Sequence, residues 1–361
     1  MVIKMRNFYL CVTTSIISLS ALLIPTSIFA QDGSLALEVI TVTAERRETS
    51  LQNTPAAIIA ITGAAIESSN INNLNELTLT TPGINIQGIN RRQQYVSMRG
   101  NVTESGDPGV AQSIGFFIDG LYFGRSSLFN QSLADIERIE VLRGPQGQLW
   151  GHNIVGGSIN VITKDPTQEF QGDVKLTLGN YGRKELSGLI AGGLTDTLAG
   201  QLTFSSEKAD GYVTNLDSGQ DLGSEDAQLV RGKLVWDINE NLTAKLSATY
   251  QQDKAGMNAR NFLPGPDAVL TIPFGPGAGR VLDTFVIPEN HEDVTYQRSQ
   301  IGTNDFELKV LGLDVEYQFA NGMTLSSLTG LLDSSGEMEN FGFFPFPERY
   351  GTFDRDHAFD D

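Results

Sequence analysis

The stretch that decides the fold runs from Ile136 to Lys164 and reads IERIEVLRGPQGQLWGHNIVGGSINVITK. It opens with residues 136–142, where Ile139 and Val141 alternate with charged residues, so this segment is predicted to be a strand with one buried face. It closes with residues 159–163, a β-branched apolar run that predicts a second strand. Glycines crowd the region between them, which indicates a backbone that bends through positive φ or passes close to another surface.

A phosphate-binding loop is one alternative explanation for so many glycines. A P-loop needs a lysine followed by Ser or Thr directly after its last glycine, but Gly157 is followed by serine without a lysine. A dinucleotide-binding loop opens a helix, whereas residues 159–163 predict a strand. Phosphate binding is therefore not expected here.

Taken whole, the stretch resembles the end of the plug domain of TonB-dependent outer-membrane receptors, nearly residue by residue. In that family the elements ERIEVLRGP, LYGxNAxGGxIN and ITK recur in this order; here Trp150 stands where Tyr is common and His152 where Arg or Lys is usual. Residues 95–100 and 114–120 are predicted strands that close on glycine, and they resemble the family's IxIRG and VxxxIDG elements. The resemblance implies structural or gating roles for the following plug residues: Arg99, Gly100, Asp119, Gly120, Glu137, Arg138, Glu140, Arg143, Gly144, Pro145, Gly151, Asn153, Gly156, Gly157 and Asn160.

Residues 1–30 are predicted to be a secretory signal peptide. Two basic residues precede an apolar run over residues 8–24, and a small residue, Ala30, offers a cleavage point before Gln31. A membrane-spanning helix is the alternative, but no basic stop-transfer flank follows and Pro25 would interrupt it. We therefore expect cleavage near Ala30.

Charge and cysteine content narrow the range of functions. The only cysteine, Cys11, lies in the predicted leader, so no disulfide, thiolate nucleophile or cysteine metal site is expected after cleavage. Without the two basic residues of the leader, the formal charge is 23 − 43 = −20. Such acidity argues against a nucleic-acid partner, which would need clustered Lys and Arg.

Residues 31–52 are predicted to be a flexible arm with one short extended motif. The segment is β-branched over residues 39–42 and is followed by a charge run over residues 45–48. By itself this is an ordinary strand next to a solvated patch. Between a leader and a plug it resembles the TonB box, which adds as a strand to the TonB energy-transducing protein. The box residues are Glu38, Val39, Ile40, Thr41, Val42, Thr43 and Ala44.

Residues 53–165 are predicted to form an α+β plug domain. Residues 56–61 form a strand pattern, and Thr62 is placed to cap a short helix that ends near Glu67. A second short helix is expected over residues 73–79, because Thr-Pro-Gly follows it.

Residues 166–361 are predicted to be antiparallel transmembrane β-barrel strands. Segments alternate strictly, most clearly over residues 242–250 and 313–319, and we count about seven such strands. A soluble sandwich would also alternate, with its apolar residues inward. Aromatic residues at the ends of the apolar faces favour a membrane barrel with an interfacial girdle: Trp236, Tyr250, Tyr317 and Phe319.

Connections between these strands also alternate in length. With the first strand running outward from a periplasmic plug, tight turns would lie in the periplasm and long loops outside. The tight turns are residues 194–196, 237–241 and 320–322, and the long loops are residues 209–225 and 254–304. The family's barrel has twenty-two strands, so we expect this sequence to be the N-terminal part of a longer receptor.

The sequence contains no arrangement typical of catalysis. The three histidines are not in zinc-binding spacing, and the serine after Gly157 lacks the Gly-x-Ser-x-Gly elbow. Glu137 and Glu140 are expected on opposite faces of a strand, so they do not form an acid–base pair. Arg143 puts a cation at the turn before Gly144, where it can pair with a carboxylate such as Glu137 or Glu140. No enzyme activity, catalytic residue, metal site or cofactor is predicted.

The resemblance implies an outer-membrane receptor in a Gram-negative bacterium, embedded in lipid and coupled to TonB. Its ligand would be a scarce small molecule. Ferric siderophore complexes, which are iron chelates, are the commonest ligands in the family. Haem, cobalamin, oligosaccharides and aromatic compounds are the alternatives. A passive porin or adhesin would explain a barrel but not the box and plug.

Overall fold

The computed structural model describes residues 41–43, 49–50, 52, 57–69, 71, 73–88, 94–103, 112–125, 128, 132–145, 147, 154–215, 221–256, 293–294, 303–338, 353–354 and 357–358. The predicted leader lies outside these residues, as do most of the loop 254–304, box residues Glu38, Val39, Ile40 and Ala44, and plug residues Gly151 and Asn153.

The stretch from Ile136 to Lys164 forms two neighbouring strands of a five-stranded mixed sheet. The first predicted strand is β9 and the second is β10, which pair antiparallel; β10 also pairs in parallel with β7. Both predicted strands are therefore confirmed. In order across the sheet, the strands are β3 (Ile58–Thr62), β9 (Ile136–Arg143), β10 (Gly157–Thr163), β7 (Ile114–Ile118) and β8 (Leu121–Tyr122).

Short helices and a second sheet complete this part of the chain. The Thr62 side chain accepts a hydrogen bond from the Ala65 amide and caps α1 (Gly63–Ser68), as the sequence predicted. The second predicted helix is split into a 3-10 turn, η2 (Leu74–Glu76), and α2 (Leu77–Thr80). The second sheet has the order β4 (Ile84–Gly88), β5 (Gln94–Met98) and β6 (Asn101–Thr103). We call residues 57–165 the plug.

Two glycine elements noted in the sequence are tight hairpin turns. Arg99 and Gly100 connect β5 to β6 with φ of 50° and 81°, and Asp119 and Gly120 connect β7 to β8 with φ of 48° and 81°. Positive φ at both central residues is what a type I′ turn requires, and this turn matches the twist of its strands. These glycines therefore fix the register of the two hairpins.

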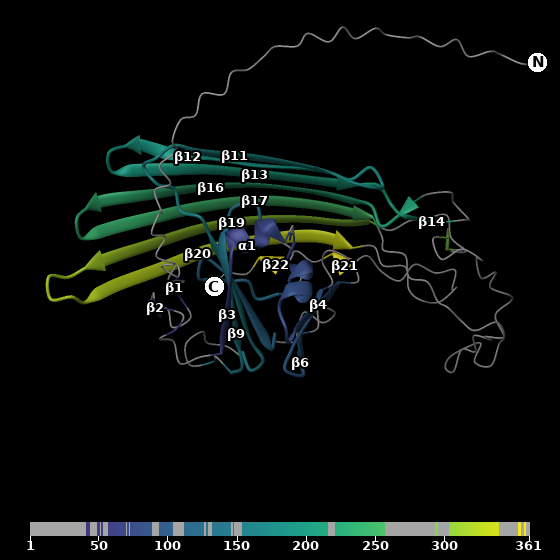
Figure 1. The fold of residues 1–361 in the computed structure, drawn as a ribbon, viewed down its shortest axis with the longest axis horizontal. Coiled ribbons are helices and arrows are strands. Elements are labelled where there is room, and N and C mark those ends of the chain that lie inside the picture. Colours follow the sequence, from purple (N-terminus) through teal and green to yellow (C-terminus); the bar gives the residue numbers. More distant parts are fainter. Residues whose placement is uncertain are drawn as a thin grey trace, which may run out of the picture. The chain divides into compact units, whose positions relative to one another are not determined.

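Residues 171–338 form one long antiparallel sheet, which we call the wall. Its seven long strands follow one another in sequence order, and Figure 1 shows them side by side, coloured from teal to yellow. They are β11 (Gln171–Leu178), β12 (Lys184–Thr195), β13 (Leu198–Ala209), β16 (Glu225–Asn239), β17 (Leu242–Gly256), β19 (Thr303–Gln318) and β20 (Thr324–Met338). The predicted plug and seven strands are thus confirmed.

The remaining strands are short. Two pair with β20, namely β21 (Phe353–Asp354) and β22 (His357–Ala358). Three form a separate small sheet: β15 (Asp221–Leu222), β14 (Val213–Asn215) and β18 (Asp293–Val294). The arm contributes the pair β1 (Thr41–Val42) and β2 (Thr49–Ser50).

The wall has apolar residues on its exposed face and polar residues on its buried face. Val174 is 72% exposed and Leu331 is 64% exposed, whereas the buried side chains include Glu207, Arg231 and Lys233. A soluble sandwich would show the opposite pattern. The exposed apolar set also includes Leu176, Leu178, Ile190, Leu202, Phe204, Val230, Leu234, Leu246, Leu311, Leu313 and Leu325. This polarity supports the membrane interpretation over the sandwich.

The aromatic residues are placed at two levels of the wall. Tyr250 pairs with Lys309, and Leu242, eight residues away on the same strand, pairs with Tyr317. Eight residues span about 26 Å along a strand, and a tilt of about 40° reduces this to about 20 Å across the sheet. This is close to the apolar band of about 25 Å that outer-membrane barrels present to lipid.

One connection departs from the predicted alternation of loop lengths. The three predicted tight turns are confirmed, but β11 and β12 are also joined by a short turn, Gly179 to Arg183. This turn lies at the strand ends opposite to the other tight turns. Tyr181 and Gly182 adopt positive φ of 56° and 63°, which allows the tight reversal. The rule that every connection on that side is long was therefore wrong. Among the described residues no helix is long and apolar enough to cross a membrane.

We predict that Gly157→Ala unfolds the centre of the plug sheet. Gly157 has a φ of 142°, and a Cβ there would overlap the Leu142 carbonyl oxygen and the Met98 sulfur. The strain and overpacking should cost about 2–4 kcal/mol. Hydrogen–deuterium exchange on protein extracted from outer membranes should show faster exchange in β9 and β10. Gly232→Ala is the matched control, since its nearest atom would be 3.9 Å away. Equal exchange in both variants would contradict this account of Gly157.

Candidate functional site

The arm strand β1 packs against the plug through a buried valine. Val42 is fully buried and contacts Leu142 of β9, with Ile58 and Ala60 of β3 packed beside it. Its backbone pairs with Thr49 of β2, so one edge of the short strand is already occupied. The described part of the predicted TonB box, residues 41–43, is therefore docked on the plug.

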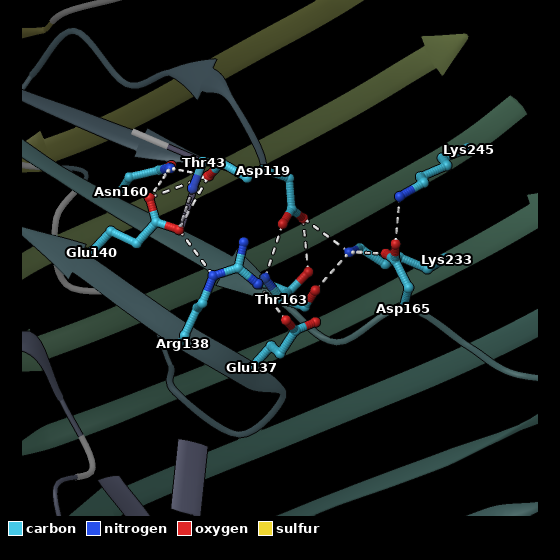
Figure 2. A network of polar contacts seen from close by, with 10 residues as sticks. All are labelled: Thr43, Asp119, Glu137, Arg138, Glu140, Asn160, Thr163, Asp165, Lys233 and Lys245. Atoms are coloured by element: carbon cyan, nitrogen blue, oxygen red, sulfur yellow. Dashed lines mark hydrogen bonds and ion pairs between the residues drawn. The ribbon is translucent and has the colours of Figure 1, made fainter. Parts of the chain in front are cut away.

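The carboxylate of Glu140 holds the next residue of the arm. It accepts hydrogen bonds from the Thr43 amide at 2.8 Å and from the Thr43 hydroxyl at 3.2 Å. The Asn160 amide group donates to the Thr43 hydroxyl at 3.2 Å and to Glu140 at 3.5 Å. Figure 2 shows these side chains converging on Thr43. Because Glu140 is 0% exposed, its charge depends on these donors and on Arg138, which donates from Nε at 2.9 Å.

The suggested pairing of Arg143 with Glu137 or Glu140 was wrong. Both Glu137 and Glu140 form ion pairs with Arg138, whereas the Arg143 guanidinium donates to the Pro82 carbonyl oxygen at 3.4 Å. Arg138 and Glu140 are two residues apart on one strand and therefore lie on the same face. The expectation that Glu137 and Glu140 point to opposite faces holds, since the first is exposed and the second is buried.

A second polar cluster joins the end of the plug to the wall. The Lys233 ammonium group lies 3.2 Å from the Asp119 carboxylate and 2.8 Å from the Asp165 carboxylate, and it donates to the Thr163 carbonyl oxygen at 3.1 Å. Lys245 adds an ion pair to Asp165 at 2.6 Å. Asp119 itself accepts hydrogen bonds from the Thr163 amide and hydroxyl. Figure 2 shows this chain of contacts.

A further ion pair lies beside this cluster. Arg231 of β16 contacts Asp135 of the plug at 2.6 Å, and both side chains are buried, at 3% and 0% exposure. Arg231 also donates to the Thr249 hydroxyl at 3.1 Å. Sequence reasoning missed Asp135 and Arg231, although Arg231 occupies an inward position in the alternating pattern of its strand.

Two lysines of the wall lower the pKa of Asp165 at the end of the plug. Burial alone would raise the pKa of its carboxyl, but Lys233 and Lys245 hold this pKa below its usual value of 3.8. A lowered folded-state pKa means that the stabilising contribution is present above 3.8 and is lost as the pH falls through the lowered value. The contact is therefore intact at neutral pH.

Apolar contacts hold the plug to the other half of the wall. Gly312 of β19 and Gly330 of β20 are directly paired, and a Cβ on either would lie 3.0 Å or less from the Leu121 side chain. The two glycines therefore form a notch that accepts Leu121. Phe306 and Leu308 of β19 belong to the same apolar core as the plug strands. Within the described part of the chain, no group of three or more His, Cys, Asp or Glu residues could hold a metal ion.

Comparison with known proteins agrees with this architecture. Residues 50–158 match the model of the TonB-dependent Receptor Plug Domain. The chain is 30% identical over 202 residues to the vitamin B12 transporter BtuB of Photobacterium profundum, covering 54% of this chain and 32% of that protein. It is 26% identical over 280 residues to the ferrioxamine B receptor of Salmonella typhimurium, covering 75% of this chain and 36% of that receptor.

Solved structures show the same fold. The ferric yersiniabactin uptake receptor FyuA from Yersinia pestis matches with a TM-score of 0.67 at 18% identity, over 78% of this chain and 41% of that one. The ferripyoverdine receptor of Pseudomonas aeruginosa matches with a TM-score of 0.64 at 19% identity, over 85% and 38%.

The chain therefore contains the plug domain of the TonB-dependent receptor family, followed by seven antiparallel strands that match part of the receptor barrel. Receptors of this family reside in the outer membrane of Gram-negative bacteria and are transporters, not enzymes, which confirms the prediction of no enzyme activity. The chain spans 32% to 36% of the length of the two curated relatives named above.

We predict that Lys233→Met loosens the end of the plug from the wall. Removing one partner of a buried ion pair costs about 3–5 kcal/mol when burial is complete; the cost here should be smaller because Asp165 is 37% exposed. Hydrogen–deuterium exchange should become faster in residues 114–122 and 157–165. The control is Lys208→Met, whose pair with Asp226 is exposed and contributes roughly 0–1 kcal/mol. A Lys233 variant that matches this control would rule out an anchoring role.

Proposed function

We propose that this chain acts as a TonB-dependent outer-membrane receptor for energy-coupled uptake, and that its ligand is a ferric siderophore complex. The observation that carries the coupling part is the extended segment 41–43, which lies on the plug while the plug is bonded to the wall. The proposal includes a leader cleaved near Ala30, the TonB box at residues 38–44 and the plug at residues 53–165.

The proposed mechanism needs no covalent chemistry from the protein. A ligand binds from outside, the arm becomes available on the inner side, and TonB pairs with the box through main-chain hydrogen bonds. Pulling on the arm then rearranges the plug and opens a path along the wall. The ion pairs of Lys233 and Arg231 hold one side of the plug to the wall during this change.

Two ligand classes have specific support. Ferric siderophore uptake is favoured by the ferrioxamine B receptor, because that similarity extends over 75% of this chain. A second sequence relative is the ferripyoverdine receptor of Pseudomonas aeruginosa, at 26% identity over 58% of this chain. Cobalamin uptake is the second candidate, because identity to BtuB reaches 30% over a shorter part, 54% of this chain.

We predict that Val42→Pro abolishes uptake while the protein still reaches the outer membrane. Proline removes the backbone donor at position 42 and fixes φ, so a strand of TonB could no longer pair in register. Ser34→Pro, in the same arm but outside the box, is the control and should transport normally. Uptake and membrane abundance should be measured together. Undiminished uptake by the Val42 variant would show that residues 38–44 are not the box.

We predict that deleting the gene abolishes growth on ferric siderophore as the only iron source. Ferrioxamine B and a pyoverdine should be tested as iron carriers, with ferric citrate as the control for general iron uptake. Growth that depends on external cobalamin should be unchanged. The reverse pattern, with lost cobalamin growth and intact siderophore growth, would replace the first ligand class with the second.

A further inference from the structure

In the docked arm, one backbone hydrogen-bond donor that a partner strand would need is already engaged. Strand addition uses backbone amides along one edge, and the amide of Thr43 is already bonded to the Glu140 carboxylate at 2.8 Å. A hydrogen bond to a charged acceptor is stronger than one to a neutral carbonyl oxygen. A partner strand must therefore displace a carboxylate, not water, to reach this donor.

The same contact ties the arm to the interior of the plug. Glu140 lies on β9, the second strand of the five-stranded sheet, and Asn160 is its direct pairing partner on β10. Both are buried, at 0% and 2% exposure, yet both reach Thr43, which comes from the distant arm. The side-chain oxygen of Asn160 has no hydrogen-bond partner within the described structure. The site is thus built around one extended residue of the arm.

We propose that Glu140, with Asn160, is a latch that keeps the TonB box unavailable until the plug changes. This inference rests on the proposed function, since it takes residues 38–44 as the box, and it assigns Glu140 as a positioning residue of the coupling step. Glu140 competes with the TonB strand for the Thr43 amide. Release of Thr43 frees this donor and also brings Val42 out from its contact with Leu142.

The test measures how fast a cysteine at position 42 reacts with a maleimide in isolated outer membranes. The chain has one other cysteine, Cys11, in the predicted leader, so Val42→Cys gives one reporter in the mature segment. Because Val42 is 0% exposed, the parent reporter should react slowly. Thr41→Cys, at an exposed position of the same strand, reports general access and should react equally fast in every background.

Two variants open the latch from opposite sides. Glu140→Gln removes the charge of the acceptor, and Thr43→Val removes the hydroxyl bonds to Glu140 and Asn160 while the Thr43 amide keeps its bond to Glu140. Each should speed labelling at position 42 about tenfold, the effect expected on losing a hydrogen bond to a charged group. Glu137→Gln is the matched control, because Glu137 also pairs with Arg138 but makes no contact with Thr43 among the described residues. It should leave the rate within about twofold of the parent.

Fast labelling of the parent, or equal rates in the Glu137, Glu140 and Thr43 variants, would overturn the latch. If Glu140→Gln misfolds, Thr43→Val decides through the hydroxyl bonds to Glu140 and Asn160 that it removes: labelling no faster than in the parent would overturn the latch. Cross-linking of the arm to TonB distinguishes failure of this inference from failure of the proposed function on which it rests. Labelling that follows the prediction without any cross-link shows that Glu140 holds the arm, but removes the box assignment and with it the role of Glu140 in coupling. Cross-linking with equal labelling in all variants leaves the box standing and removes the latch.

Discussion

The contact on which the rest of the structure depends is the buried ammonium group of Lys233 between Asp119 and Asp165. The wall has its apolar face exposed, so its polar residues must lie on the other face and find partners there. The plug supplies those partners in the form of acidic side chains, and Asp135 does the same for Arg231. The plug and the inner face of the wall are therefore complementary in charge, and neither would be satisfied without the other.

Two different kinds of contact join the plug to the wall, and a third holds the arm. Strands β16 and β17 bind the plug through ion pairs, whereas β19 and β20 bind it through Leu121 in the glycine notch and through Phe306 and Leu308. In the described part of the arm, the contact consists of one buried valine and the hydrogen bonds of Thr43. In the proposed mechanism this difference lets the arm leave first while the plug end stays bound to the wall.

Sequence reasoning predicted those features that are set by local pattern. Strand alternation, the Thr62 cap and the two strands that close on glycine all follow from neighbouring residues, and each was confirmed; that these glycines form hairpin turns was seen only in the structure. Partners distant in sequence were not predicted. Asp135 and Arg231 are 96 positions apart, and their contact depends on the register of the strands between them. The same reason explains why Arg143 was paired wrongly. Its partner was inferred from nearness in sequence, whereas Arg138 lies two residues from Glu140 on β9, on the same face of the strand, and forms the ion pair.

The central claim is that the apolar face of the wall contacts lipid while the polar face contacts the plug. Trp236, on the apolar face and 50% exposed, tests it directly. The sequence has two tryptophans, so a Trp150→Phe background leaves Trp236 as the single one. Protein reconstituted into brominated phospholipid should lose most of the Trp236 fluorescence that it shows in ordinary phospholipid. Fluorescence unchanged from that in ordinary phospholipid would place Trp236 away from lipid and contradict the assignment of the two faces.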